Sequence, residues 1–378
     1  MKKIFYSGII ILILFEFFNV YLIMPMPGSQ RMNSIEVAYF LFSYRWIFRI
    51  LFCSIIVISF FKATWRRKWI PLLILIILSP IVYLVNFKMS ADHMFLQTKK
   101  LTMADARANT VDTQCLVIGV ERNGFAKAYP IQFLGYHHQV LDSLNGQPIM
   151  VTYCTVCRTG RVYEPKVNDR MENFRLVGMD HFNAMFEDAT TKSWWRQESG
   201  EAIAGKLKGE RLPEILSTQT SLHQWLQLHP NSLIMQPNES ESADYVSENY
   251  ENGKSSGGLT GTDSLSWKDK SWVIGVKINH QSKAYDWNKL ISQRIIHDNI
   301  GNIPVLLVLS SDNKSFFAFE RASNIVKFRL QNDTLFNNNQ CYKVDGTAIE
   351  NTPSLKRLSA YQEFWHSWRT FNPDTKVY

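Results

Sequence analysis

The chain contains two related halves in its C-terminal region. The run VIGVERNGFAKAYP begins at Val117, and the run VIGVKINHQSKAYD begins at Val273. Further matches, at somewhat smaller offsets, pair Phe174–Leu176 with Phe328–Leu330 and Trp225 with Trp368. A repeat held over this length predicts two similar packed units, with the residues kept in both copies forming the scaffold.

The second copy lacks three of the most reactive side chains of the first. The replaced residues, each followed by its counterpart, are His137 (Gln293), Cys154 (Ser310) and Cys157 (Asn313). We therefore predict one functional site in the first copy, residues 113–235, and a scaffold role for the second copy, residues 267–378. Residues 236–266 are rich in Ser, Asn, Glu and Gly, which is typical of a linker or long surface loop.

The first 87 residues have the composition of a membrane region. Their apolar stretches are Phe5–Met24, Val37–Phe61 and Trp69–Phe87, and each is long enough for a hydrocarbon core of about 30 Å. Arg45 and Arg49 interrupt the second stretch, so we place its span nearer Ile47–Phe61, with the arginines reaching the headgroups. We predict three spans in residues 1–87 and a connector over residues 88–112. The alternative for the first stretch is a cleaved signal peptide, but no small-residue cleavage site follows it.

The formal net charge of +8 is concentrated in this membrane region. Residues 1–87 hold nine Lys/Arg and two acids, so the other 291 residues carry a net charge of only +1. Basic segments stay in the cytoplasm, and three spans place both Lys2–Lys3 and the Lys62–Lys68 cluster there. Residues 88–378 are then expected outside the cytoplasm. This charge distribution also argues against binding to nucleic acid.

Short runs rich in Val, Ile, Tyr and Phe predict that both copies are mostly β. In the first copy the runs are Cys115–Val120, Ala126–Tyr129, Pro148–Tyr153, Gly160–Tyr163 and Asn173–Val177. Apolar residues at helical spacing predict one amphipathic helix per copy, over Thr220–His229 and Ala360–Phe371. The predicted fold class is therefore mostly β (α+β), with a barrel and a sandwich as open alternatives.

Cys154 and Cys157 end a predicted strand in the run TYCTVCR, and three interpretations are open. The first is an inert disulfide of an oxidising compartment, because four cysteines outside the membrane region allow three pairings of Cys115, Cys154, Cys157 and Cys341. The second is a catalytic thiol-redox pair whose thiolate Arg158 stabilises, although a turn and a strand, not a helix, are expected after the motif. The third is a metal centre.

A metal centre needs ligands beyond the two sulfurs. Met185 and His181 lie in Val177–Ser199, where the first copy has eight additional residues. His137 precedes the Asn145–Gly146 turn by as many residues as Cys154 follows it, so a regular hairpin places these two side chains opposite each other. The predicted shell is therefore His137, Cys154 and Cys157 with Met185 or His181. Soft ligands of this kind favour one copper ion, whereas two thiolates with two imidazoles favour zinc.

Trp194, Trp195 and Gln197 in the same segment are candidate substrate-binding residues that line a pocket. The alternative is simple aromatic packing, which is commoner in β proteins. The sequence contains no Walker loop, dinucleotide-binding glycine motif, HExxH or GxSxG motif. The identity of a small-molecule substrate stays open.

The run VTYCTVCRTG, preceded by KAYPIQFLGYHHQVLDSLNGQPI and followed by WWRQESGEAIAGKLKGERL, resembles a bacterial family of unknown function. Members of that family read close to TYCPLCGSG and carry a W-x-Q-x-x-GEAIAG block downstream. The resemblance implies that recurrent family positions are occupied by His137, Cys154, Cys157, Gln197 and either Trp194 or Trp195. The chain departs at Thr155, Val156 and Arg158, where the family has Pro-Leu and Gly, which argues against a rubredoxin-like knuckle. The resemblance implies a bacterial protein, which the predicted spans place in the inner membrane, and it supports a single site in the first copy but implies no activity.

Two hypotheses of function follow from these patterns. The first is a membrane-anchored extracytoplasmic protein with a copper, zinc or thiol-redox centre at Cys154 and Cys157. The second is a non-enzymatic binding or assembly module, in which the cysteines form a structural disulfide and the spans contact membrane-protein partners. The metal content and thiol state of the protein distinguish the two.

Overall fold

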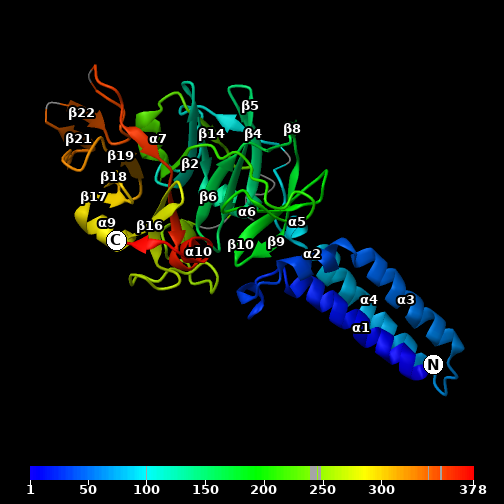
Figure 1. The fold of residues 1–378 in the computed structure, drawn as a ribbon. Coiled ribbons are helices and arrows are strands. Elements are labelled where there is room, and N and C mark those ends of the chain that lie inside the picture. The colour runs from blue at the N-terminus through cyan, green and yellow to red at the C-terminus, as the bar shows by residue number, and fades with distance from the viewer. Residues whose placement is uncertain (99, 239–244, 246–247, 339, 350) are drawn as a thin grey trace. The chain divides into compact units, whose positions relative to one another are not determined.

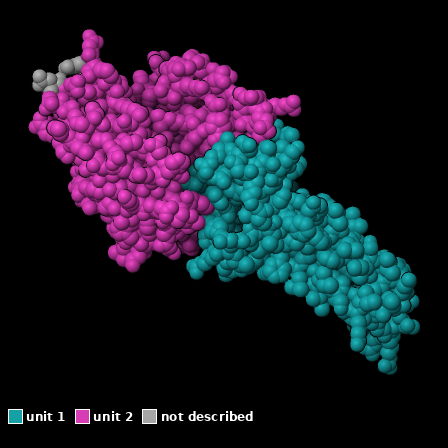
Figure 2. All heavy atoms as spheres, viewed as in Figure 1, with its two compact units in different colours: residues 1–96, 172–211 teal, residues 97–171, 212–378 magenta. Residues whose placement is uncertain are grey.

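The computed structural model describes residues 1–378 except 99, 239–244, 246–247, 339 and 350. The described residues form two compact units, each discontinuous in sequence (Figure 2). Residues 1–96 and 172–211 make up the first unit, and residues 97–171 and 212–378 make up the second. Residues 172–211 were expected to pack within the first copy of the repeat, and they instead group with the N-terminal helices.

Apolar helices dominate the N-terminal part of the first unit (Figure 1). They are α1 (Lys2–Tyr21), η1 (Ser29–Arg31), α2 (Ile35–Ser43), α3 (Arg45–Lys62), α4 (Trp69–Tyr83) and η2 (Leu84–Lys88), followed by the short α5 (Ala91–Met94). Among the described residues, the helices Lys2–Tyr21 and Trp69–Lys88 are long and apolar enough to cross a membrane. Helices α2 and α3 are bent by 62° and make a third span if they count as one broken helix. The apolar stretches thus form helices of the expected kind.

Helices α1, α3 and α4 pack together through apolar side chains. Phe5 and Ile9 of α1 are buried against Ile56 of α3 and side chains of α4. Within this contact the carboxylate of Glu16 accepts two hydrogen bonds from the Arg49 guanidinium, at 2.8 and 2.9 Å. Removing one partner of a buried pair is strongly destabilising, so this pair fixes α3 against α1.

A four-stranded antiparallel sheet completes the first unit. Its spatial order is β12 (Ala202–Ala204), β11 (Trp194–Arg196), β10 (Asn183–Asp188) and β9 (Phe174–Asp180). Met185 and Trp194 belong to a buried cluster with Leu22 and Ile23 of the N-terminal segment. The backbone N–H of Met179 donates to the carbonyl of Ile23 at 2.7 Å. These contacts explain why residues 172–211 group with the N-terminal helices.

In the first half of the second unit, most of the strands belong to one of two sheets. In chain order its elements are β1 (Met103–Ala104), β2 (Leu116–Arg122), β3 (Phe125–Pro130), α6 (Ile131–His137), β4 (Gln139–Leu144), β5 (Gln147–Cys154), β6 (Thr159–Tyr163), β7 (Lys166–Val167), β8 (Arg170–Met171), β13 (Ser217–Ser221), α7 (Leu222–Leu228) and β14 (Leu233–Met235). One sheet has the order β1-β14-β3-β2-β13, and another has the order β4-β5-β6. The β4–β5 hairpin turns at Asn145–Gly146, as the dipeptide predicts, and pairs Gln139 with Thr152.

The second half follows the same succession of strand and helix types. After α8 (Glu248–Glu251) come β15 (Trp272–Ile278), β16 (Gln281–Asp286), α9 (Trp287–Gln293), β17 (Ile295–Ile300), β18 (Ile303–Leu309), β19 (Phe316–Glu320), β20 (Arg329–Gln331), β21 (Thr334–Asn337), β22 (Gln340–Lys343), β23 (Lys356–Leu358), β24 (Ala360–Phe364), α10 (Trp365–Phe371) and β25 (Lys376–Val377). The sheet order β24-β15-β16-β25 matches the order β13-β2-β3-β14 of the first half. In both sheets the last strand pairs in parallel with its neighbour.

A glycine on the first long strand of each half makes room for a buried tryptophan. A Cβ atom at Gly119 would overlap the ring of Trp225, and a Cβ at Gly275 would overlap the ring of Trp368. Both tryptophans are about 1% exposed and come from the helices α7 and α10. The repeated Gly and Trp of the sequence are therefore a packing pair.

The helix content corrects the expected fold class. The described residues contain ten α-helices and several small sheets, so the fold is mixed α/β, and each half of the second unit has two helices of seven residues where one was expected. The periodicity missed α6 because six of its seven residues are buried, so this helix has no polar face and shows no amphipathic period. The expected helix Ala360–Phe371 is strand β24 as far as Phe364 and becomes helical at Trp365.

Candidate functional site

Cys154 and Cys157 lie at the turn between β5 and β6. Cys154 is the last residue of β5 and pairs with Thr159, the first residue of β6. Arg158 has a φ of 58°, a left-handed conformation that few residues other than glycine adopt. The motif is thus followed by a turn and a strand, as expected. No helix begins at the cysteines, so they lack the helix dipole that lowers the thiol pKa in thioredoxin-like motifs.

The two cysteine side chains are fully buried and lie in contact. Neither has exposed surface, and their thiol groups are hydrogen-bonded to each other. Burial, followed by the hydrogen bond and the charge of Cys154 and by the charge of Glu363, raises the pKa of Cys157 well above its usual value, and the Ser367 hydroxyl opposes this rise. Cys157 is therefore a protonated thiol at neutral pH and not an activated nucleophile.

The second half of the unit supplies polar groups beside the cysteine turn. The backbone N–H of Phe364 donates to the carbonyl of Cys157 at 3.0 Å. The junction between β24 and α10 therefore lies directly beside the cysteine turn. The Ser367 hydroxyl donates to Glu363 Oε2 at 2.9 Å, and Arg161 Nη2 donates to Glu363 Oε1 at 2.5 Å. The Arg161 and Glu363 side chains are 2% and 0% exposed. A buried ion pair therefore adjoins the thiols.

One lysine and one histidine also contact this turn. Lys270 Nζ donates to the carbonyl of Val156 at 2.9 Å, and His366 Nε2 lies 3.2 Å from the same oxygen. Lys270 interacts electrostatically with both cysteines, and burial lowers its pKa. Burial and the neighbouring Lys270 lower the pKa of His366 to about 4, so this imidazole is neutral at pH 7. Lys270 is thus a cation placed to compensate negative charge on the sulfurs.

The equivalent turn of the second half makes the reciprocal contact. The Ser310 hydroxyl donates to Gln224 Oε1 at 3.0 Å, and the Ser221 hydroxyl donates to Asp312 Oδ2 at 2.7 Å. Helix α7 of the first half therefore meets the β18–β19 turn, as α10 of the second half meets the β5–β6 turn. Between them, Gln219 Nε2 donates to Gln362 Oε1 at 2.9 Å. Each half therefore contributes a helix that contacts the turn of the other half, but only the β5–β6 turn contains cysteines.

Arg158 acts through neighbours other than the thiols. Its Nε donates to Gln362 Oε1 at 2.9 Å, and its Nη2 donates to the carbonyl of Glu251 at 2.8 Å. The guanidinium carbon lies 3.7 Å from the centroid of the Trp272 ring, a favourable cation–π contact. No described carboxylate forms an ion pair with Arg158. It is therefore a positioning residue that links the cysteine turn to α8 and β24.

A cavity of about 190 Å³ lies beside these Arg158 contacts. Its lining residues are Leu116, Glu251, Asn252, Trp272, Trp287, Asp312, Asn313, Lys314 and Gln362. Glu251 is almost fully buried, and burial raises its pKa to about 7. The backbone N–H of Leu116 donates a hydrogen bond to its carboxylate and opposes this rise. Two tryptophan rings and a carboxyl group whose pKa is shifted by burial are typical of the lining of a small-molecule pocket.

His137 does not lie on a strand, which corrects the hairpin expectation. The strands β4 and β5 pair in the register that the sequence predicts. However, β4 begins only at Gln139, and His137 is the last residue of α6. His138 adopts a left-handed φ of 59° at the end of that helix. The His137 ring packs against Tyr136 and Tyr245, with centroids 5.0 and 5.7 Å apart. Among the described residues there is no group of three or more His, Cys, Asp or Glu that could hold a metal ion.

The other predicted ligands and pocket residues belong to the first unit, where each makes local contacts. Met185 is buried in the cluster beneath α2, and His181 Nδ1 and Nε2 lie 2.7 Å from Asp180 and 3.1 Å from Asn33. The remaining contacts are those of Trp194 Nε1 with Glu187, Trp195 Nε1 with Asp188, and Gln197 Oε1 with Asn183 Nδ2. These contacts describe packing, and a role of the five residues in metal or substrate binding stays a prediction.

The structure adds functional candidates that the sequence reasoning missed. They are Lys270, Glu363, Ser367 and, at the cavity, Glu251 and Gln362. Each comes from outside the first copy and reaches the cysteine turn or Arg158 through the fold. One signal was available, because Glu363 is an acid within an otherwise uncharged stretch, Ala360–Trp368.

The chain is thus a protein with apolar N-terminal helices and a mixed α/β unit that buries a cysteine pair. Residues 97–375 match the family described as "Protein of unknown function (DUF3179)". The match covers most of the chain, and the protein belongs to this family. No curated protein and no solved structure shows significant similarity to the chain.

Proposed function

We propose that this protein is anchored in the bacterial inner membrane and holds a copper(I) ion between Cys154 and Cys157 on the extracytoplasmic side. The observation that carries the proposal is the contact between two fully buried thiols beside the Lys270 ammonium group. Soft sulfur ligands select copper(I). Two thiolates and one monovalent cation leave a single negative charge, which Lys270 balances.

Copper(I) fits the surroundings of the pair better than zinc does. Structural zinc sites take four protein ligands, and catalytic sites take three, whereas no group of three candidate ligands exists among the described residues. Two sulfurs are sufficient for copper(I), which accepts linear coordination. Because burial raises the pKa of Cys157, binding must displace a proton, and the apparent affinity should fall as the pH decreases.

Thiol redox is the second candidate, and the direct contact of the two thiols favours it. Oxidation would join the sulfurs in a disulfide and release two protons and two electrons, which a disulfide of a partner accepts as it becomes a dithiol. The high pKa of Cys157 makes this exchange slow unless the site opens. In the third alternative, a non-enzymatic assembly module, the same pair is a permanent structural disulfide.

The location rests on the charge distribution of the membrane region. The basic residues at Lys2–Lys3 and Lys62–Lys68 favour the cytoplasm. With α2 and α3 counted as one span, three helices are long and apolar enough to cross, and three crossings would put the chain after Lys88 outside.

We further propose that the second unit is a duplicated domain in which one copy kept its site. The repeated sequence, the matching strand orders and the reciprocal turn contacts support this. Ser310 and Asn313 then mark the position of a lost site and provide an internal control.

The test is an anaerobic copper(I) titration of the full-length protein in detergent, in competition with a chromophoric copper(I) chelator. We expect one ion per chain, lost in Cys154→Ser and in Cys157→Ser and retained in Ser310→Ala and Cys341→Ser. Lys270→Gln should weaken binding about tenfold, because it removes a charge worth about 1–2 kcal/mol at this range. Binding that survives both cysteine substitutions would refute the copper site. A disulfide that titrates reversibly with glutathione would favour redox, and one that resists reduction would favour the structural module.

A further inference from the structure

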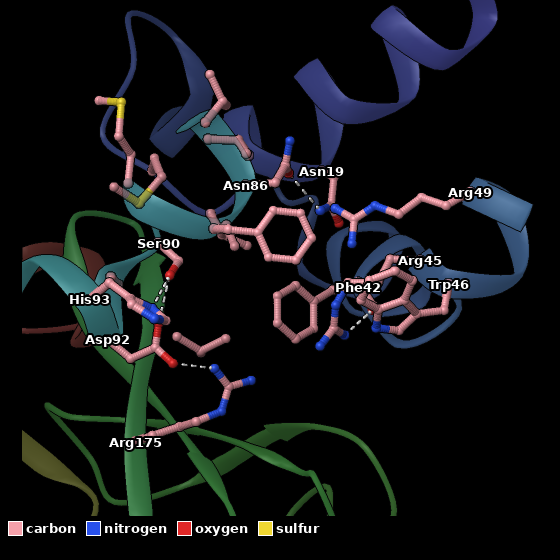
Figure 3. A pocket seen from close by; sticks show the side chains of 18 residues that line it. Asn19, Phe42, Arg45, Trp46, Arg49, Asn86, Ser90, Asp92, His93 and Arg175 are labelled. Atoms are coloured by element: carbon pink, nitrogen blue, oxygen red, sulfur yellow. Dashed lines mark hydrogen bonds and ion pairs between the residues drawn. The ribbon is translucent and has the colours of Figure 1, made fainter. Parts of the chain in front are cut away.

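A second pocket lies in the first unit, at one end of the apolar helices (Figure 3). Its volume is about 180 Å³, and its walls come from the end of α1, the start of α3, η2, α5 and β9. The Lys62–Lys68 cluster is at the opposite end of the helices, where α3 ends and α4 begins. With the three-span topology proposed above, the pocket is at the membrane surface farther from the basic cluster.

Three arginines line this pocket, and two of them are neutralised. Arg49 is paired with Glu16 through two hydrogen bonds. Arg175 of β9 is paired with Glu187 at 2.7 Å and with Asp92 at 2.9 Å. Hydrogen bonds from Ser90 and the Arg175 charge outweigh burial and lower the pKa of Asp92, so this carboxylate stays ionised.

Arg45 is the arginine without a carboxylate partner among the described residues. Its guanidinium donates to the carbonyl of Phe42 and lies 3.8 Å from the centroid of the Phe42 ring. The Arg175 guanidinium lies 5.6 Å from the same centroid. Arg175 is already paired with Glu187 and Asp92, so Arg45 is the guanidinium at this ring whose charge an added anion would balance.

The remaining walls are apolar and aromatic. Val20 and Ile23 of the α1 end, Trp46 of α3, and Val85 and Phe87 of η2 line the pocket. Figure 3 shows Arg45, Trp46 and Arg49 entering from α3 and Arg175 from the strand. Aromatic side chains at a membrane surface sit at the level of the lipid headgroups. A ligand that matches the pocket has one anionic group and an apolar tail.

We propose that this pocket binds the phosphate headgroup of a membrane phospholipid, with Arg45 as the phosphate ligand. Planar guanidinium groups suit phosphate oxygens through paired hydrogen bonds. This site is independent of the cysteine pair and of the copper proposal.

The experiment is native mass spectrometry of the full-length protein, delipidated in mild detergent and then titrated with phosphatidylglycerol. Diacylglycerol is the phosphate-free control, and inorganic phosphate tests whether the anion alone suffices. Arg45→Gln is compared with Arg66→Gln, which removes an equal charge from an exposed position in the basic cluster. Far-UV circular dichroism checks that each variant keeps its helices.

We expect one phosphatidylglycerol per chain, bound about tenfold or more weakly by Arg45→Gln, since a hydrogen bond to a charged group contributes roughly 1.5–3 kcal/mol. Arg66→Gln should bind like the wild type. Equal binding by Arg45→Gln and wild type would overturn the proposal, as would equal binding of diacylglycerol. Inorganic phosphate that binds alone and displaces the lipid would show that the source is free phosphate and would also overturn it. Should Arg45→Gln misfold, the comparison of phosphatidylglycerol with diacylglycerol on the wild type decides.

Discussion

Replacing Glu363 with Gln should destabilise the protein by leaving the Arg161 guanidinium buried beside a neutral amide. The two side chains are 2% and 0% exposed and are joined at 2.5 Å. Breaking a buried pair by removing one charge costs about 3–5 kcal/mol. The carboxylate of Glu214, 3.7 Å from Arg161 Nε and 40% exposed, compensates part of this loss. We therefore expect about 3 kcal/mol, the lower end of that range.

The assay is urea denaturation of the full-length protein in detergent, followed by tryptophan fluorescence and checked by thermal melting. A loss of 3 kcal/mol should lower Tm by about 6–12 °C for a unit of this size. Glu214→Gln is the matched control, because it removes the exposed partner of the same guanidinium and should cost about 0–1 kcal/mol.

A second measurement separates a role at the cysteines from a purely structural one. The Glu363 charge contributes to the raised pKa of Cys157, so Glu363→Gln should lower the pH at which thiolate absorbance appears, and Glu214→Gln should not. A stability loss no larger than that of the control would refute the buried-pair reasoning. An unchanged thiol titration would show that Glu363 does not influence the site.

Three further outcomes are expected. Gly119→Ala should cost about 1–3 kcal/mol in urea denaturation, because its methyl group overlaps the Trp225 ring. Burial raises the pKa of Glu251 to about 7, so the folded state keeps a proton that the unfolded chain releases near pH 4.5. Stability should therefore decrease by about 3 kcal/mol as the pH rises from 4.5 to 7, and Glu251→Gln should remove this slope. A membrane-impermeant thiol reagent added to intact cells should label Ser256→Cys but label Thr64→Cys only after lysis, and the opposite pattern would reverse the topology.

Local signals in the sequence were reliable where short-range chemistry decides the structure. Asn145–Gly146 has positive φ at both residues, which is the requirement of a tight hairpin turn, and this turn sets the β4–β5 register. The apolar stretches became helices, as expected of segments that are long and apolar enough to cross a membrane. The repeated Gly119 and Trp225 correctly marked scaffold.

The residues that surround the cysteine turn could not be predicted from the sequence in the same way. Lys270, Glu363 and Ser367 are more than 100 residues from the cysteines, and only the fold brings them to the turn. The hairpin position expected for His137 was wrong for a local reason, since the seven-residue helix α6 takes the place of the strand extension that would have faced Cys154. The segment 172–211 was assigned to the repeat by its neighbours in sequence, although its apolar side chains pack on the N-terminal helices.

The reciprocal contacts between the two halves have a consequence for how such a domain originates. A single copy would leave its β5–β6 turn without the cover that α10 supplies, and its own α7 without the turn that it covers. Two identical copies related by a two-fold axis would satisfy each other, as an isologous homodimer does. Under the proposed duplication, an ancestor of this kind would carry two equivalent cysteine sites. Once both copies lie on one chain, mutations no longer strike both sites together, so Ser310 and Asn313 can replace sulfur on one side while the other side is preserved.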